Sequence, residues 1–209
     1  MTKTLVALAF VLSAALVAAW HVTLGFRTLT SEEARRMRVA EAPMPVSPLR
    51  VVDSRGATLG LWNSDSPTRV WLVTFVYTRC PSLCLALGSE FQQLQASMQA
   101  TEGVRLASLS FDRTHDTPAA LAEYAEHHHA DPARWLVAVP DSDTALSRLL
   151  HEMGVIAIDD GAGGYSHNAA IHVVTASGKL VALFDLERHA EALAYARELA
   201  STDTNLAAQ

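Results

Sequence analysis

The chain has 209 residues, of which 50% are hydrophobic, enough for one domain with a substantial core and an additional segment. Its formal net charge of −6 at pH 7 argues against nucleic-acid binding, because such binding depends on the neutralisation of phosphates by basic residues. A core of this size does not need a disulfide to fold, so the two cysteines are interpreted as functional residues.

The N-terminal segment between Lys3 and Arg27 carries no charged residue. A membrane-spanning helix needs about 20 apolar residues, whereas the apolar region of a cleaved signal peptide has about 7–15. Residues 17–19 resemble a cleavage site only weakly, and the apolar run continues to Phe26. We therefore predict a single-pass membrane anchor at residues 1–27, with a cleaved signal peptide as the alternative.

The rest of the chain is expected to lie outside the cytoplasm. Basic residues follow the anchor, but a long domain crosses a membrane largely regardless of its charge. We expect a bacterial-type inner-membrane protein with its soluble domain on the periplasmic side. Residues 28–48 are polar and then proline-rich, which predicts a linker. A folded domain is expected at residues 49–202 and a short tail at 203–209.

Strand-like and helix-like segments alternate along this domain. The expected strands are 49–52, 58–62, 70–77, 104–111, 135–139, 155–158, 169–175 and 180–184, and the expected helices are 84–98, 118–128, 144–153 and 187–199. The almost continuously apolar Val70–Tyr77 is typical of a buried central strand. The order predicts an α/β fold, a thioredoxin-like sandwich with an N-terminal β-hairpin.

The two cysteines, Cys80 and Cys84, lie between this central strand and the start of the next helix. A helix N-terminus stabilises a thiolate, which is the form that attacks disulfides and binds metals. In a helix, the spacing of four residues would put both sulfurs on one face. Disulfide exchange, metal binding and a structural disulfide all remain open from this pattern alone.

A metal site would need further ligands, and the chain has nine histidines. The three consecutive histidines, 127–129, are interpreted as a solvated face at a helix end. His167 follows a glycine-rich loop directly and stands at the entry to a hairpin strand. In a strand, His167 and His172 would point to opposite faces, so only one of them can face the cysteines.

Three segments together resemble the Sco/SenC family. They are YTRCPSLC at 77–84, SFDRTHDTPAALAEYA at 110–125 and SHNAAIHVVTASG at 166–178. Members of this family are membrane-anchored, thioredoxin-like copper proteins of cytochrome c oxidase assembly. The resemblance covers roughly residues 43–200.

The resemblance implies one copper ion per chain, Cu(I) or Cu(II), bound by Cys80, Cys84 and His167, the last of them on a hairpin. The resemblance also associates Asp112 with the site, although not as an established ligand. The alternative is that Asp112 only forms a turn. Three positions depart from the family pattern: Leu85 and Arg113 stand where proline is frequent, and Ser166 stands where aspartate is frequent. The last change removes a carboxylate beside the histidine, and such neighbours tune metal affinity.

The function that the resemblance implies is a copper metallochaperone rather than an enzyme. It would deliver copper to the dinuclear copper site of a respiratory cytochrome c oxidase, with the copper-accepting oxidase subunit as its partner. The alternative is a thiol–disulfide oxidoreductase with Cys80 and Cys84 as the redox pair. It would reduce the cysteines of that copper site or act in extracytoplasmic redox homeostasis, kept reduced by a thiol reductant partner. A peroxiredoxin-type peroxidase is a third hypothesis, which the sequence favours less.

Overall fold

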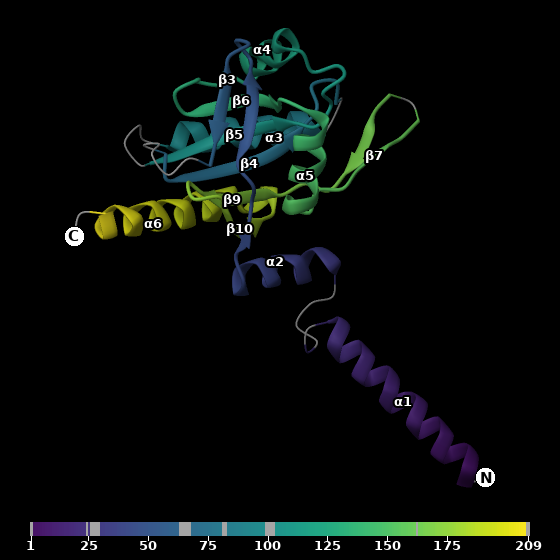
Figure 1. Ribbon diagram of the computed structural model, residues 1–209. Coiled ribbons are helices and arrows are strands. Elements are labelled where there is room, and N and C mark those ends of the chain that lie inside the picture. The colour runs from purple at the N-terminus through teal and green to yellow at the C-terminus, as the bar shows by residue number, and fades with distance from the viewer. Residues whose placement is uncertain are drawn as a thin grey trace. The chain divides into compact units, whose positions relative to one another are not determined.

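A computed structural model describes residues 2–23, 25, 30–62, 68–80, 83–98, 103–161 and 163–207, and the side chains of 83–86 and 203–207 lie outside this description. The chain forms two compact units, Met1–Ala42 and Pro43–Gln209. Figure 1 shows the elements of both units.

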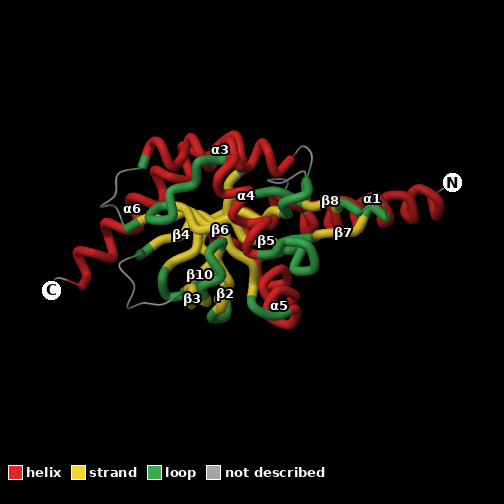
Figure 2. Tube along the Cα trace, turned by 90° about the horizontal axis from the view of Figure 1, so that it is seen from above, coloured by secondary structure: helices red, strands yellow, loops and turns green. Residues whose placement is uncertain are grey.

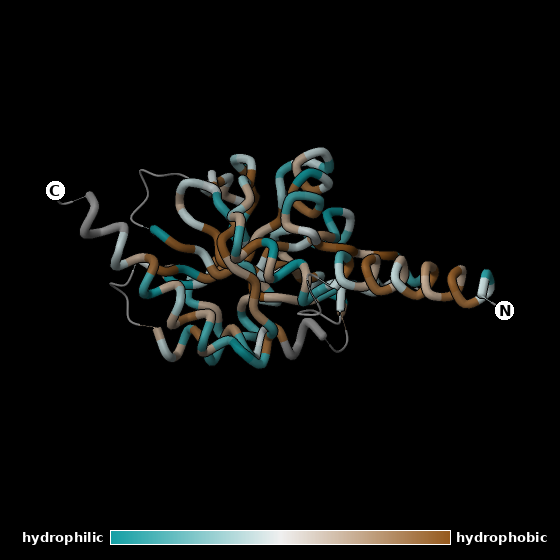
Figure 3. The backbone as a smooth tube through the Cα atoms, turned by 90° about the horizontal axis from the view of Figure 1, so that it is seen from below, coloured by the Kyte–Doolittle hydropathy of each residue, from teal (hydrophilic) through white to brown (hydrophobic). Residues whose placement is uncertain are grey.

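The first unit holds helices α1 (Thr2–Val22) and α2 (Ser31–Glu41). Helix α1 is long and apolar enough to cross a membrane, a property that it shares with signal sequences. Its hydrophobic character is visible as the largely brown tube in Figure 3. Helix α2 begins with an N-cap in which the Thr30 side chain accepts a hydrogen bond from the Glu33 N–H (3.1 Å).

The second unit is built on an eight-stranded sheet with the order β1-β10-β9-β4-β5-β6-β2-β3. Its strands are β1 (Met44–Pro45), β2 (Leu49–Asp53), β3 (Thr58–Leu61), β4 (Val70–Val76), β5 (Val104–Ser110), β6 (Trp135–Pro140), β9 (Ile171–Thr175) and β10 (Lys179–Phe184). Strands β4, β5 and β6 are parallel neighbours, and the remaining pairs of this sheet are antiparallel. The N-terminal β-hairpin is confirmed as β2 and β3.

Within the described residues, four helices pack on this sheet: α3 (Leu83–Ser97), α4 (Pro118–His127), α5 (Asp143–Met153) and α6 (His189–Ala207), the last preceded by a 3-10 turn at Leu186–Arg188. Helix α6 contacts α3 and strands β4, β9 and β10, whereas α5 contacts β2 and β6. Figure 2 shows α3 and α5 on opposite sides of the strands. The fold is therefore the expected thioredoxin-like α/β sandwich.

The segment expected as a linker, 28–48, contains both helix α2 and strand β1. Strand β1 pairs with β10 at the edge of the sheet, with Pro45 opposite Lys179. An edge strand tolerates proline, because the missing N–H would have no ladder partner on its outer side. The proline-rich composition of this segment thus fits a short edge strand.

A second, two-stranded sheet consists of β7 (Ala157–Asp159) and β8 (Tyr165–His167). His167 therefore belongs to a small separate hairpin, and not to the entry of the β9–β10 hairpin, where the sequence suggested it. The chain can reverse between the two strands because Gly161 and Gly163 adopt positive φ angles of 73° and 89°.

The topology brings two loops to one edge of the sheet. Strands β4 and β5 are parallel and in register, with Val76 opposite Ser110. The segments that follow them, 77–80 and 111–116, consequently start side by side. This edge is the place where open α/β sheets present their functional residues.

Candidate metal centre

Cys80 lies at the end of a turn that leaves the buried strand β4. Every residue of β4 is buried, and Cys80 is 9% exposed. Its backbone N–H donates to the Tyr77 carbonyl (3.2 Å). Cys84 lies in the first turn of α3, where helix N–H groups and the helix dipole favour a thiolate, although its side chain lies outside the described atoms.

The turn before Cys80 is held by a carboxylate that sequence reasoning missed. The buried Asp116 accepts hydrogen bonds from the Thr78 N–H (3.0 Å) and the Thr78 hydroxyl (2.7 Å). It also accepts one from the Ser110 hydroxyl at the end of β5. Asp116 lies in the Asp-Thr-Pro sequence at the start of α4, and no local pattern indicates its contact with Thr78, 38 residues away.

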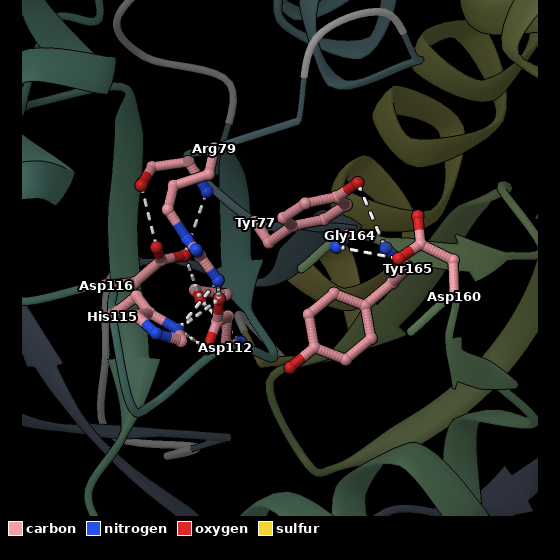
Figure 4. A network of polar contacts seen from close by, with 10 residues as sticks. Tyr77, Arg79, Asp112, His115, Asp116, Asp160, Gly164 and Tyr165 are labelled. Atoms are coloured by element: carbon pink, nitrogen blue, oxygen red, sulfur yellow. Dashed lines mark hydrogen bonds and ion pairs between the residues drawn. The ribbon is translucent and has the colours of Figure 1, made fainter. Parts of the chain in front are cut away.

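Asp112 binds Arg79, the residue that follows Thr78 in the same turn. Its buried carboxylate accepts a hydrogen bond from Arg79 Nη2 (2.9 Å) and contacts His115 Nδ1 (2.8 Å). Burial disfavours the charged carboxylate, but the hydrogen bonds and charges of Arg79 and His115 outweigh it and hold the pKa of Asp112 below its usual value. Asp112 therefore acts on the residue directly before Cys80, as Figure 4 shows.

His167 reaches the same edge from the β7–β8 hairpin. Its ring centroid lies 5.0 Å from that of Phe111 and 6.3 Å from that of Tyr77. Its Nδ1 is 3.1 Å from the Asn168 carbonyl oxygen, which can only accept, so Nδ1 carries the proton. Burial lowers the pKa of His167 despite this hydrogen bond, so the ring is neutral at pH 7.

The second ring nitrogen of His167 has the properties of a metal ligand. Nε2 is buried and has no hydrogen-bond partner within the described structure. With the proton on Nδ1, Nε2 presents a lone pair, and a backbone carbonyl at the other nitrogen is the usual way in which a ligating histidine is oriented. A buried nitrogen without a partner is costly unless something binds it. The site thus fits a metal that accepts imidazole.

Tyr77 connects the histidine hairpin to the cysteine turn. The Tyr165 N–H donates to the Tyr77 hydroxyl oxygen (3.2 Å), and the two rings lie 5.2 Å apart in an edge-to-face arrangement. Figure 4 shows Tyr77 pointing toward Gly164 and Tyr165. Because Tyr77 precedes Cys80 by three residues, this contact ties the position of β8 to that of the turn.

A cavity of about 500 Å³ opens beside Cys80. Its walls include Arg79, His115 and His128. His128 is buried and not part of a solvated face, because its ring lies against Gly88 of α3, where a Cβ atom would come within 2.2 Å of it. This burial also lowers the pKa of His128.

Of the two histidines considered, His167 contacts Tyr77 and Phe111, beside the turn that ends at Cys80. The buried ring of His172 instead packs against Phe75 (5.3 Å) within the sheet. Among the described side chains, which exclude that of Cys84, no three histidine, cysteine, aspartate or glutamate side chains converge on one metal position.

Fold and site together define the class: a thioredoxin-like α/β protein with two cysteines after its central strand and a neutral histidine on a neighbouring hairpin. The chain belongs to the SCO1/SenC family, whose family model matches residues 40–201. The SCO1 protein homolog of Bacillus subtilis (strain 168) is 24% identical over 115 residues, which are 54% of this chain and 60% of that relative.

Solved structures agree with this fold. ScoI of Bradyrhizobium japonicum, solved with copper bound, superposes with a TM-score of 0.61 at 23% identity, over 74% of this chain and 99% of that one. BsSco, described as a Sco-family cytochrome c oxidase assembly protein with a disulfide switch, gives a TM-score of 0.62 at 18% identity, over 77% and 95%. The Sco family is thus one of cytochrome c oxidase assembly proteins, and the Bradyrhizobium japonicum relative is solved with copper bound.

Proposed function

We propose that the protein is a metallochaperone that carries one copper ion on Cys80, Cys84 and His167. The observation that carries this proposal is the buried Nε2 of His167, which has no hydrogen-bond partner in the described structure and belongs to a neutral ring beside Tyr77 and Phe111. The copper-bound structure of the Bradyrhizobium japonicum relative supports copper as the metal.

The chemistry of the donor set suits transport rather than storage. Thiolates select Cu(I), and imidazole also suits copper. Copper is the cargo here, and it would leave by ligand exchange, in which an acceptor thiolate replaces one donor at a time. Neither thiol changes its oxidation state in such a transfer. The acceptor in this proposal is the copper-accepting subunit of a respiratory cytochrome c oxidase.

His167→Ala tests the ligand set. We expect the full-length variant in detergent to lose more copper affinity than the about 10–100-fold that removal of an outer partner of a ligand costs. His151→Ala is the matched control, since His151 is exposed on α5. Competition with a copper chelator measures the affinity, and equal values for wild type and His167→Ala would contradict the three-ligand site.

A thiol–disulfide oxidoreductase is the second candidate. Two observations favour it: Cys80 borders an open cavity, and the relative BsSco has a disulfide switch. In this case Cys80 attacks a disulfide of the acceptor, a mixed disulfide forms, and Cys84 resolves it, so that two electrons pass to the acceptor. Measuring cytochrome c oxidase assembly in cells distinguishes the metallochaperone from the oxidoreductase. The redox function predicts normal assembly with His167→Ala and failed assembly with Cys80→Ser.

A further inference from the structure

Asn168 lies at the base of the β7–β8 hairpin, directly after His167. The chain enters this hairpin from the C-terminal end of α5, which lies beside β7 in Figure 1. The last register pair at this end of the hairpin joins Ala157 and His167, so Ile156 and Asn168 form the next pair beyond it. Asn168 is half-buried, and both its main chain and its side chain bond to neighbouring backbone groups.

The hydrogen bonds between Ile156 and Asn168 depart from those of a regular antiparallel pair. In a hydrogen-bonded pair, each residue donates its N–H to the backbone carbonyl of the other. The Asn168 N–H follows this rule and donates to the Ile156 carbonyl (3.3 Å). The Ile156 N–H instead donates to the side-chain Oδ1 of Asn168 (2.7 Å). The backbone carbonyl of Asn168 is thereby left for another donor.

His167 supplies that donor. Its Nδ1–H donates to the Asn168 carbonyl (3.1 Å), and this bond leaves the lone pair on Nε2. In a regular ladder, a carbonyl points along the sheet toward the neighbouring strand, whereas side chains stand roughly perpendicular to the sheet. A carbonyl held by the Ile156 N–H would therefore point away from the ring of His167.

The other half of the Asn168 amide fixes this arrangement. Its Nδ2 donates to the Gly154 carbonyl (3.1 Å), and only this orientation of the amide satisfies both of its neighbours. Gly154 ends α5 in the left-handed conformation, with a φ of 64°. The carbonyl of Met153, one residue earlier, accepts from Nε2 of the buried His172 on β9 (3.2 Å). Asn168 thus connects the His167 ring to the end of a helix that is itself tied to the main sheet.

We propose that Asn168 is a positioning residue for His167, because its side-chain amide replaces its own backbone carbonyl in the hairpin ladder and so frees that carbonyl for His167 Nδ1. The inference rests on the proposed function, in which Nε2 of the same ring binds copper. Asparagine suits this position because one side chain offers both an acceptor and a donor. Aspartate offers only acceptors at pH 7, and leucine offers neither.

The position of the ring proton tests this inference in the metal-free, full-length protein in detergent. Proton–nitrogen correlation NMR spectra identify which ring nitrogen of His167 carries it. We expect Nδ1–H in the wild type and in Asn168→Asp, which keeps an oxygen for the Ile156 N–H. Asn168→Leu should shift the tautomer ratio toward Nε2–H by at least about 5-fold, the effect of losing one hydrogen bond, because the carbonyl at position 168 then turns to the Ile156 N–H.

Copper affinity, measured by chelator competition, is the second readout. We expect Asn168→Leu to lower it by about 10–100-fold, the usual effect of removing an outer partner of a ligand, and Asn168→Asp to lower it less. Ser142→Ala is the control for a merely structural effect, because it removes the side-chain N-cap at the other end of α5. It should keep both the tautomer and the copper affinity of the wild type.

The outcomes separate this inference from the proposed function. A folded Asn168→Leu variant with the wild-type tautomer ratio or the wild-type copper affinity would overturn the role of Asn168. Asn168→Ala, which adds no bulk, carries the same expectations and takes its place if the leucine variant does not fold. Equal copper affinity of wild type and His167→Ala would instead overturn the proposed function, and the tautomer ratios would still decide how Asn168 acts on the ring.

Discussion

At the scale of single residues, buried carboxylates shape the cysteine turn. Asp116 binds Thr78, and Asp112 binds Arg79, so the two residues before Cys80 each have an anionic partner on the β5–α4 loop. Both carboxylates are buried, and a buried charge persists only when it is paired and hydrogen-bonded. These interactions hold the two residues before Cys80 in place.

Asp112→Asn is expected to lower the free energy of unfolding at pH 7 by about 1–3 kcal/mol, because the bonds from Arg79 and His115 lose their anionic acceptor. The folded-state pKa of Asp112 is depressed, so this stabilisation is complete above the unfolded value near 3.8 and is lost as the pH falls through the lower folded value. Urea denaturation of the wild type and Asp112→Asn, at pH 7 and below pH 3.8, measures the difference in their free energies of unfolding. A difference that does not shrink in acid would contradict this prediction.

At the scale of elements, Tyr77 joins the hairpin that carries His167 to the cysteine turn. The Tyr77 hydroxyl accepts the Tyr165 N–H across 88 residues of sequence. Rings of Tyr77, Phe111 and Tyr165 pack between the two elements. The hairpin has its own two-stranded sheet, so these contacts are what aligns His167 with the end of β4.

Tyr77→Phe keeps the ring and removes the acceptor oxygen. We expect faster hydrogen exchange of the Tyr165 amide and a loss of copper affinity of about 5–10-fold, equivalent to one hydrogen bond of about 1 kcal/mol. Exchange measured by NMR and chelator competition report the two effects. Tyr195→Phe, at an exposed position of α6, is the control, and unchanged exchange at Tyr165 would show that the bond does not hold the hairpin.

At the scale of the whole molecule, an apolar helix in the first unit precedes an α/β second unit, and the boundary between the units lies at Ala42. The proposed arrangement is a domain held at the periplasmic side of an inner membrane. An anchored donor meets a membrane-bound acceptor within a thin layer, which raises the effective concentration of each for the other.

Reporter fusions to Gln209 test this arrangement. We expect an alkaline phosphatase fusion to be active and a green fluorescent protein fusion to be dark, since the first needs the oxidising periplasm and the second folds in the cytoplasm. Deletion of residues 2–26 should reverse both signals. A fluorescent fusion of the full chain would place the domain in the cytoplasm instead.

Local sequence patterns were sufficient to predict the strands and helices around the site. The continuous apolar run of β4 predicts a buried strand within one residue of its observed end, because burial on both faces leaves a signal in adjacent positions. Thr117 and Gly154 likewise mark a helix start and a helix end by capping chemistry. The cysteines could be placed after a central strand by the same logic.

The amino-acid sequence alone determined the strand, the helix start and the two thiols between them, since these depend on interactions between near neighbours. Tertiary structure decided what surrounds the thiols. The bonds from Thr78 to Asp116 and from Tyr165 to Tyr77 span 38 and 88 residues, and no local periodicity encodes such pairs. The burial that leaves His167 Nε2 with no partner in the described structure arises in the same way, when a separate hairpin folds against the end of β4.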